Sequence, residues 1–428
     1  MFIKIKSSTW YLEKRMNRIL IVEDNKALAK LIALKMGAEL DFEIDIAYTF
    51  QEAKLFIKKY NYFLALLDLN LPDAPNGEIV EYALERELPS IILSGIVDKE
   101  LRKKLIQKDI IDYIKKDGIS SIEYIISTIK RLHDNQKHKV LIVDDSLVFR
   151  NQMQKMVKNM FFQVITVAHG EEALAMLQIH PDIKIVLADY FMPVMDGLEL
   201  TKEIRKQYSK NDLSIITISS NQDEEITALF LKNGANDYIY KPFSKEEFIC
   251  RLNNTIEALE NIEKITNNAN RDFLTGVYNR RYFYANTQEY FQEAKQSGQN
   301  FGVAMIDIDH FKKINDTYGH DTGDKAIVNL SQILTTSVDA KDIVARFGGE
   351  EFCIILKDMS ANAIKEKLET IRQKVEKSSI KDHDKQISFT VSIGVVTSAE
   401  DTLEETINTA DMFLYNAKNG GRNQVVSD

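Results

Sequence analysis

The sequence predicts an α/β protein of three domains, two with doubly wound parallel sheets and a third with a central, mostly antiparallel sheet. In the first two thirds of the chain, short apolar strands alternate with helical patterns, which is typical of parallel sheets covered by helices. This pattern occurs twice, because the spacing from Asp24 to Asp68 equals the spacing from Asp145 to Asp189. In the last third, two apolar runs flank a Gly-Gly pair, as in a β-hairpin.

The length of 428 residues suits about three domains of ordinary size. From the pattern of strands and helices we expect an N-terminal extension over 1–16, a first domain over 17–134 and a second over 138–243. A connecting helix is predicted over 244–269, and the third domain over 270–428.

The composition is that of a soluble globular protein, with 44% hydrophobic and 28% charged residues. Because the net charge is −9, we expect no nucleic-acid partner. No apolar run reaches the length of a membrane span, and Met1 to Lys6 lack the apolar core of a signal peptide, so no membrane insertion is expected. Two cysteines, Cys250 and Cys353, are too few for a disulfide framework and favour a cytoplasmic location.

Polar residues end or follow the strands predicted for the first domain. These strands cover 18–22, 63–67, 90–94 and 111–115, a helix is predicted over 26–36, and the polar residues are Glu23, Asp24, Asp68, Ser94 and Lys116. The second domain repeats this arrangement. Its strands cover 139–143, 186–188, 215–218 and 237–240, and its polar residues are Asp144, Asp145, Asp189, Ser219 and Lys241.

In open parallel sheets, ligands bind at the carboxyl ends of the strands, so these side chains should meet at one edge of each sheet. Three carboxylates, Asp144, Asp145 and Asp189, suit a Mg²⁺ site. Asp189 could attack a phosphoryl donor to form an aspartyl phosphate, while Ser219 and Lys241 hold the phosphoryl oxygens. The alternative is that these acids are ordinary surface residues or helix caps. It does not account for two sets of polar residues at the same spacing.

This constellation resembles the receiver domain of two-component response regulators, on the residues Asp189 to Gly197 (DYFMPVMDG) and Lys241-Pro242-Phe243. The resemblance implies that Asp189 is the phosphoacceptor, Asp144 and Asp145 are metal ligands, and Ser219 and Lys241 are switch residues. Tyr238 matches the aromatic residue that reorients on activation. A sensor histidine kinase or phosphotransfer protein is the implied partner.

The first copy matches the receiver family less closely. Glu23 and Asp24 replace the acid pair, and Asp68, Ser94 and Lys116 take the places of the acceptor, hydroxyl and lysine. Asp117 follows the lysine where the family has proline, which leaves the placement of the lysine open. Both copies can be phosphorylated on this reading, and the second is favoured as acceptor. The alternative role of the first copy is to mediate dimerisation alone.

The stretch 244–269 contains neither proline nor glycine and carries apolar residues close to helical spacing. It is predicted to continue the last helix of the second domain. Two roles remain open for it. One is a helix that packs on its own domain, and the other is a short coiled coil that pairs two chains.

The most informative stretch of the last third is Arg346 to Phe352 (RFGGEEF), which lies between two predicted strands. Two acids at a hairpin tip repel each other, so Glu350 and Glu351 suggest a bound cation. Mg²⁺ is the first candidate, with Mn²⁺ as the alternative, because it binds carboxylates and substrate phosphates together. The two glycines allow the backbone to approach a ligand closely.

This stretch resembles the GGDEF family of diguanylate cyclases, and the resemblance extends over residues 268–428. Further matching blocks are Asp272 to Arg281 (DFLTGVYNRR), Ile306 to Asp316 (IDIDHFKKIND), and Ala417 to Asn423 (AKNGGRN). It implies Asp307, Glu350 and the carbonyl of Ile308 as metal ligands, and Glu351 as the base for the 3′-hydroxyl.

The resemblance also implies a GTP site. Its substrate-binding residues are Phe311, Lys312, Asn315, Asp324, Lys418 and Arg422. Lys312, Lys418 and Arg422 would neutralise the triphosphate, although helix-end cations are common. Asn315 and Asp324 would read the guanine edge, and the ring of Phe311 is expected in the core. Each domain would hold one GTP, so the product requires a homodimer.

One position departs from the family. Many members carry Arg-x-x-Asp just before the GGDEF motif, where the product binds and inhibits, but here Asp339 replaces the arginine and Asp342 remains. Aspartate cannot form the bidentate contacts of arginine, so we predict weak or absent product inhibition at this site.

The sequence therefore predicts a cyclase that condenses two GTP into cyclic di-GMP and two pyrophosphates under the control of phosphorylation. The main alternative is a catalytically silent GGDEF output domain that binds GTP or cyclic di-GMP as a switch. The intact metal and base positions argue against it. A mixed GMP–AMP cyclase is disfavoured by Asp324, and a DNA-binding regulator by the negative charge and the missing basic helix.

Overall fold

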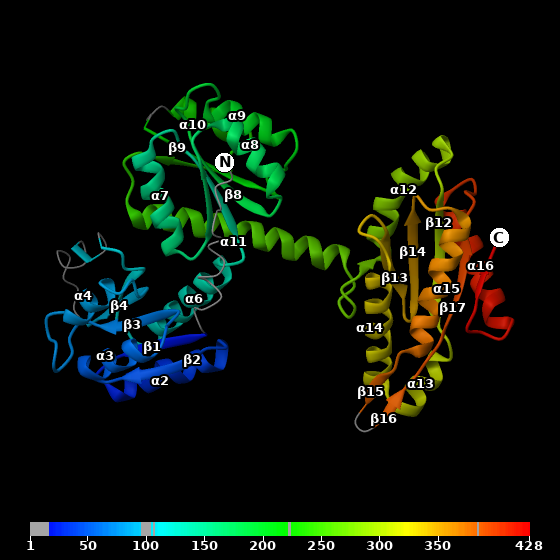
Figure 1. The fold of residues 1–428 in the computed structure, drawn as a ribbon, viewed down its shortest axis with the longest axis horizontal. Helices are drawn as coiled ribbons and strands as arrows, with labels where there is room; N and C mark the ends of the chain where they lie inside the picture. Colours follow the sequence, from blue (N-terminus) through cyan, green and yellow to red (C-terminus); the bar gives the residue numbers. More distant parts are fainter. Residues whose placement is uncertain (1–16, 96–103, 106–107, 221–223, 383–384) are drawn as a thin grey trace, which may run out of the picture. The chain divides into compact units, whose positions relative to one another are not determined.

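The structure is a computed structural model that describes residues 17–95, 104–105, 108–220, 224–382 and 385–428. The predicted N-terminal extension, 1–16, lies outside the described residues. The chain divides into two compact units, one ending at Glu260 and the other beginning at Asn261. Figure 1 shows the first unit with two sheets and the second with one large sheet.

The first domain is a five-stranded sheet in the order β2-β1-β3-β4-β5, and every neighbouring pair is parallel. Its elements are β1 (Arg18–Val22), α2 (Lys26–Glu39), β2 (Glu43–Ala47), α3 (Phe50–Lys59), β3 (Leu64–Asp68), α4 (Glu78–Leu84), β4 (Ser90–Ser94), β5 (Asp112–Lys115) and α6 (Ile119–Asn135). After Arg18, strand β1 is apolar and buried because helices cover both faces of the sheet.

The second domain repeats this sheet in the order β7-β6-β8-β9-β10, again with parallel pairs. Its elements are β6 (Lys139–Val143), α7 (Leu147–Asn159), β7 (Gln163–Val167), α8 (Gly170–Ile179), β8 (Ile183–Asp189), α9 (Gly197–Arg205), β9 (Ser214–Ser219), α10 (Glu224–Lys232), β10 (Asp237–Tyr240) and α11 (Lys245–Asn270). The two domains share one apolar core, in which the rings of Phe63 and Phe161 lie 4.6 Å apart.

Helix α11 leaves the second domain and extends across the division between the two units. Its first turns bury Phe248, Leu252, Ile256 and Leu259 in the shared core of the first unit. Further along, Ile265 is 67% exposed. The first part of α11 is therefore a domain-packing helix, and the pairing of two chains through its later part stays a prediction.

The third domain has a six-stranded sheet in the order β11-β13-β14-β12-β17-β18. The three central pairings are antiparallel and the two at the edges are parallel. The elements are β11 (Tyr278–Asn279), α12 (Arg280–Ser297), β12 (Phe301–Ile308), α13 (Phe311–Tyr318), α14 (His320–Ser337), β13 (Ile343–Gly348), β14 (Glu351–Lys357), α15 (Ala361–Lys377), β15 (Ile380–Asp382), β16 (Lys385–Ile387), β17 (Val391–Val396), α16 (Leu403–Asn419) and β18 (Val425–Ser427).

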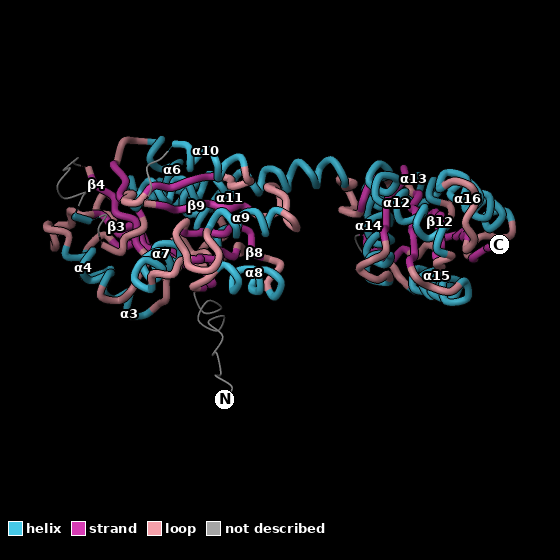
Figure 2. The backbone as a smooth tube through the Cα atoms, turned by 90° about the horizontal axis from the view of Figure 1, so that it is seen from above, coloured by secondary structure: helices cyan, strands magenta, loops and turns pink. Residues whose placement is uncertain are grey.

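Helices enclose this sheet on both faces, as Figure 2 shows for the cyan helices around the magenta strands. Helices α14 and α15 bury apolar residues against one face, and α12 and α16 against the other. The predicted fold class is therefore confirmed, with two parallel sheets and a mixed sheet whose central pairings are antiparallel. Among the described residues, no helix is long and apolar enough to cross a membrane.

Candidate active site and phosphoacceptor sites

The polar side chains of the second domain meet at the carboxyl edge of its sheet. Lys241 Nζ lies 2.6 Å from Asp189 Oδ1 and 3.2 Å from Asp144 Oδ2. The backbone places this lysine, because its N–H donates to the carbonyl of Ser219 at 2.7 Å. Burial raises the pKa of Asp189, and the contact with Lys241 opposes that rise. The predicted phosphoacceptor, Asp189, is thus a buried carboxylate within hydrogen-bond distance of the Lys241 ammonium group.

The remaining predicted residues of this domain differ in their surroundings. Ser219 is fully buried at the end of β9, and Tyr238 is buried against Phe230. Asp145, in contrast, is exposed. The proposed ligand atoms of Asp144, Asp145 and Asp189 are not gathered within 4.8 Å of one another, as judged over the described residues.

The first domain brings its acids closer together than the second does. Ligand atoms of Glu23, Asp24 and Asp68 all lie within 4.8 Å of one another. Lys116 Nζ is 2.6 Å from Glu23 Oε2 and 2.7 Å from Asp68 Oδ2. Its N–H donates to the Ser94 carbonyl at 2.9 Å, as the equivalent lysine does in the second domain. The lysine therefore reaches both acids without the proline.

Burial raises the pKa of Glu23, and Lys116 opposes that rise. For the lysine itself, burial acts to lower the pKa, but hydrogen bonds to Asp68 and Glu23 raise it overall. A compact group of three carboxylates with one lysine fits a divalent cation, since oxygen ligands of this kind are those that Mg²⁺ takes.

In the third domain, strand register brings the acids to one sheet edge, but over the described residues the ligand atoms of Asp307, Glu350 and Glu351 are not all within 4.8 Å of one another. Strand β12 lies between β14 and β17, and Asp307 pairs with Glu351 on one side and Ser392 on the other. The predicted hairpin is present between β13 and β14, with Gly349 at a φ of +46°. Glu350 and Glu351 thereby lie at the same sheet edge as Asp307.

The charge balance at this edge favours a cation. Lys418 Nζ, from the last turn of α16, lies 2.8 Å from Asp307 Oδ2. Burial raises the pKa of Asp307 to about 6; Lys418 opposes the rise, and the charges of Glu350 and Glu351 add to it. One lysine does not neutralise three carboxylates. A donor set of this kind fits Mg²⁺ or Mn²⁺, which would stabilise the ionised acids.

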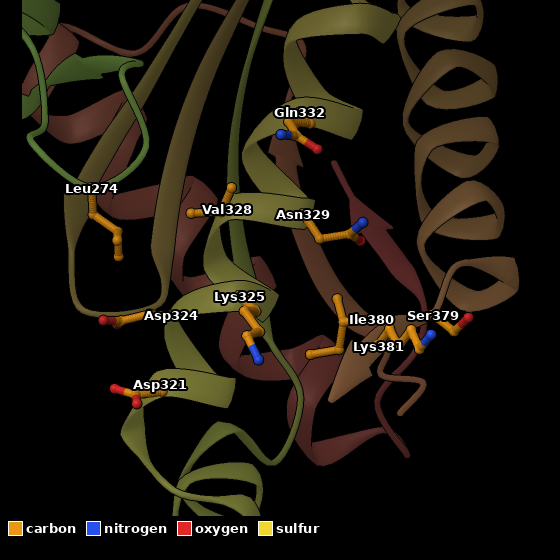
Figure 3. A pocket seen from close by; sticks show the side chains of 10 residues that line it. All are labelled: Leu274, Asp321, Asp324, Lys325, Val328, Asn329, Gln332, Ser379, Ile380 and Lys381. Carbon is orange, nitrogen blue, oxygen red and sulfur yellow. The ribbon is translucent and has the colours of Figure 1, made fainter. Parts of the chain in front are cut away.

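The predicted guanine readers lie on α13 and α14. The Oδ1 atom of Asn315 is buried and has no hydrogen-bond partner within the described residues. Gly323 makes room for it, because a Cβ there would overlap this oxygen. Asp324 is exposed and lines an open cavity of about 460 Å³ together with Leu274. Figure 3 shows Asp324 and Asp321 extending from α14 on the side of Leu274.

The other predicted substrate residues named here lie on α13 and on the loop after α16. Phe311 is half-buried and packs against the apolar core, as expected for its ring. Lys312 is exposed in the first turn of α13. Arg422 is exposed in the loop after α16, at a φ of +66°.

Comparison with known families agrees with this geometry. The model described as the response regulator receiver domain matches residues 19–127 and 140–253, and the model described as the diguanylate cyclase, GGDEF domain matches residues 269–424. The chain belongs to the response regulators that carry a GGDEF domain.

Similar proteins share this organisation to different extents. The response regulator PleD of Caulobacter vibrioides is 25% identical over 451 residues, covering 96% of this chain and 98% of that protein. Diguanylate cyclase A of Treponema denticola is 34% identical, covering 42% of this chain and 52% of that protein. A crystal structure described as a two-component system response regulator/GGDEF domain protein aligns with a TM-score of 0.52 and 39% identity, covering 57% of this chain and 99% of that one.

In the GGDEF domain, the altered Arg-x-x-Asp stretch has a structural role. Asp342 is buried, and its carboxylate accepts the N–H groups of Asp339 and Lys357, both at 2.9 Å. Lys367 Nζ lies 2.9 Å from Asp339 Oδ2 and 3.7 Å from Asp342 Oδ2. Both aspartates are thus engaged within the domain, and weak product inhibition stays a prediction.

Sequence reasoning assigned no role to Asp309, which the structure places next to the candidate active site. Its buried carboxylate accepts the hydroxyls of Thr390 at 2.7 Å and Ser392 at 2.6 Å, and the N–H of Asn423 at 3.0 Å. The sequence feature that could have indicated Asp309 is its position two residues after Asp307. Its partners lie far along the chain, so the sequence did not show what Asp309 contacts.

Proposed function

We propose that the protein is a diguanylate cyclase that converts two GTP into cyclic di-GMP and two pyrophosphates, and that phosphorylation of its receiver domains regulates it. The observation that carries the proposal is the register that pairs Asp307 with Glu351, with Lys418 on Asp307. This geometry supports the proposal because Asp307, Glu351 and Lys418, which we assign as metal ligand, base and phosphate-binding cation, lie at one sheet edge. We place the activity in the cytoplasm.

The reaction forms two phosphodiester bonds. The 3′-oxygen of each GTP attacks the α-phosphorus of the other, the bond from that phosphorus to the β-bridging oxygen breaks, and pyrophosphate leaves. Glu351 accepts the 3′-hydroxyl proton. A divalent cation held by Asp307, Glu350 and the Ile308 carbonyl would supply charge neutralisation at the phosphates. Lys312, Lys418 and Arg422 bind the triphosphate, and Asn315 and Asp324 orient the guanine.

A homodimer is part of this proposal. The assigned residues form one GTP site in the described part of the GGDEF domain, whereas the product contains two GMP units. Two domains must therefore face each other with one GTP each. Transfer of a phosphoryl group from a histidine kinase or phosphotransfer protein to Asp189, or to Asp68, would shift the population toward this productive dimer.

Nucleotide turnover by the full chain tests the proposal. GTP and Mg²⁺ are supplied with and without beryllofluoride, which mimics a phosphoryl group on aspartate, and the products are separated by chromatography. We expect cyclic di-GMP, more of it with beryllofluoride, and none from Glu351→Gln. A folded wild type that binds GTP but makes no product would favour the silent switch instead.

Two aspartate variants decide which receiver carries the signal. We expect Asp189→Asn to lose the response to beryllofluoride while keeping the basal turnover. Asp68→Asn is the matched change in the first receiver, whose acids form the more compact group. If only Asp68→Asn lost the response to beryllofluoride, the phosphoacceptor would be Asp68 in the first receiver and not Asp189.

The guanine readers have a matched control on the same helix. Asp324→Asn should lower the preference for GTP over ATP, because the carboxylate can accept from the ring N–H and the exocyclic amine of guanine together. Asp321 lines the same cavity, and Asp321→Asn should keep the preference for GTP over ATP. Equal losses in both variants would contradict the assignment of Asp324.

A further inference from the structure

The loop after α16, residues 420–424, has an unusual backbone. Gly421, Arg422 and Asn423 have φ values of +117°, +66° and +46° in succession. Residues other than glycine rarely adopt positive φ values. Two adjacent residues of this kind persist only where the surrounding structure holds them. The loop must therefore be fixed by contacts with the rest of the domain.

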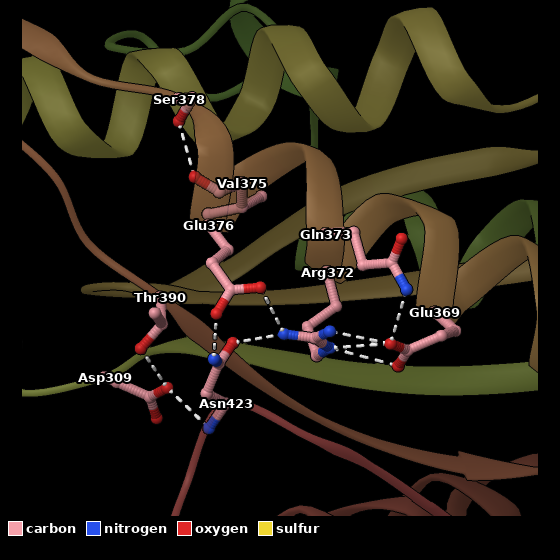
Figure 4. Close-up of polar contacts among 9 residues, drawn as sticks. All are labelled: Asp309, Glu369, Arg372, Gln373, Val375, Glu376, Ser378, Thr390 and Asn423. Carbon is pink, nitrogen blue, oxygen red and sulfur yellow. Dashed lines mark hydrogen bonds and ion pairs between the residues drawn. The ribbon is translucent and has the colours of Figure 1, made fainter.

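Asn423 supplies those contacts, as Figure 4 shows. Its backbone N–H donates to Asp309 Oδ2 at 3.0 Å, and its amide nitrogen donates to Glu376 Oε1 at 2.8 Å. Its amide oxygen accepts from Arg372 Nη1 at 2.7 Å. The backbone donor and both ends of the side-chain amide are thus all engaged.

The partners of Asn423 are themselves held in place. Arg372 donates to Glu369 from Nε and Nη2, and to Glu376 Oε2 at 3.0 Å. Asp309 is tied to Ser392 in β17 and to Thr390 just before that strand. Helix α15 and the end of β12 therefore meet at Asn423.

The position of this anchor relates it to the nucleotide site. Asp309 follows the proposed ligands Asp307 and Ile308 directly, and Asn423 follows Arg422 directly. The exposed guanidinium of Arg422 is carried on a strained backbone, so its direction depends on how the next residue is held. Loss of the anchor would let the cation move relative to the metal-binding strand end.

We propose that Asn423 is a positioning residue for triphosphate binding. Held by Asp309, Arg372 and Glu376, it fixes the left-handed loop that aims Arg422 at the β- and γ-phosphates of GTP. The inference rests on the proposed function, because it takes the ligand to be a nucleoside triphosphate. A positioning role for Asn423 differs from a purely structural role, because it predicts that changing Asn423 selectively weakens triphosphate binding.

Equilibrium binding to the full chain separates these roles. One probe is guanosine 5′-(α,β-methylene)triphosphate with Mg²⁺, in which the bond that the cyclase breaks is replaced. The other is GMP, which lacks the β- and γ-phosphates. Asn423→Gly keeps the backbone freedom that the loop needs and removes the amide. We expect roughly tenfold weaker binding of the triphosphate, as for the loss of one charge-assisted contact, and less than a twofold change for GMP.

A double-mutant cycle tests the coupling to Arg422. In an Arg422→Ala background, Asn423→Gly should change triphosphate binding by less than about twofold, because the cation that it positions is gone. Equal tenfold losses with and without Arg422, or an equal loss for GMP, would overturn the proposal in favour of a structural role.

Rescue and control variants complete the test. Asn423→Asp puts a carboxylate opposite Glu376 and should weaken triphosphate binding, and adding Glu376→Gln returns an amide donor and should restore it. Gln373→Ala is the control, since Gln373 contacts Glu369 but not Asn423. No restoration in the double variant would count against the proposal. If the wild type binds the analogue but makes no cyclic di-GMP, the cyclase function is refuted and the role of Asn423 is not. If the wild type fails to bind the analogue, both the cyclase function and the role of Asn423 are refuted.

Discussion

The contact at Glu260 allows a quantitative test of how the first unit is held together. Arg131 donates two hydrogen bonds to this carboxylate, at 2.8 and 2.6 Å, and His138 Nε2 lies 2.7 Å from it. The hydrogen bond from Arg131, opposed by burial, lowers the pKa of Glu260 from 4.5 to about 2. At about 1.4 kcal/mol per unit, the contacts favour the ionised form by roughly 3 kcal/mol.

Solvent reduces this figure, because the Glu260 side chain is 20% exposed. We expect Glu260→Gln in the full chain to lower the free energy of unfolding of the first unit by about 1.5 kcal/mol, roughly half of that figure. For a unit of this size, the thermal midpoint should fall by roughly 3–6 °C. Differential scanning calorimetry measures that midpoint, and Glu263→Gln, an exposed position on the same helix, is the control.

The pH dependence gives a second check on the sign. A lowered pKa in the folded state stabilises the fold above the unfolded value of 4.5, and that stabilisation is lost as the pH falls toward 2. The difference between wild type and Glu260→Gln should be full at pH 7 and smaller at pH 4. An unchanged midpoint at pH 7, an equal effect of Glu263→Gln, or a difference that grows as the pH falls would refute the reasoning.

Three further predictions concern single side chains. Gly323→Ala should raise the KM for GTP at least tenfold in steady-state assays while the fold is kept, because the added Cβ displaces Asn315; an unchanged KM would exclude Asn315 from the guanine site. Asp342→Ala should lower the thermal midpoint, because two partly buried N–H groups lose their acceptor, at up to about 1–3 kcal/mol, and cyclic di-GMP should inhibit wild type and variant equally weakly; tight inhibition that disappears in the variant would contradict this. Leu252→Ala should cost about 2–5 kcal/mol in thermal unfolding of the first unit, whereas the exposed Ile265→Ala should cost little; comparable effects would be inconsistent with the shared core.

Much of the organisation could be predicted from the sequence because it depends on local patterns. The apolar strands that end in Glu23, Asp68 and Asp189 predict parallel sheets with polar edges, since strand ends of one sheet face the same side. The Gly-Gly-Glu-Glu pattern likewise predicts a hairpin. These features need only the order of residues over short distances.

Other features were decided by tertiary structure. Lys116 reaches its acids without the proline, because β5 pairs with β4 in a register that places the lysine beside Ser94. The second receiver has the closer sequence match, yet the first has the more compact acids. Small shifts between neighbouring strands set such distances, and the residue order alone does not specify them.

The sequence by itself determined the three-domain organisation, the family resemblance and the candidate metal, base and phosphate residues of the GGDEF domain. Tertiary structure alone decided that Asp307 pairs with Glu351 and that Asp309 meets Asn423. These residues lie far apart along the chain and come together only when β12, β14 and the final loop pack in one register. The physical reason is that a long-range contact depends on how whole elements pair and pack, whereas a motif is carried by neighbouring residues.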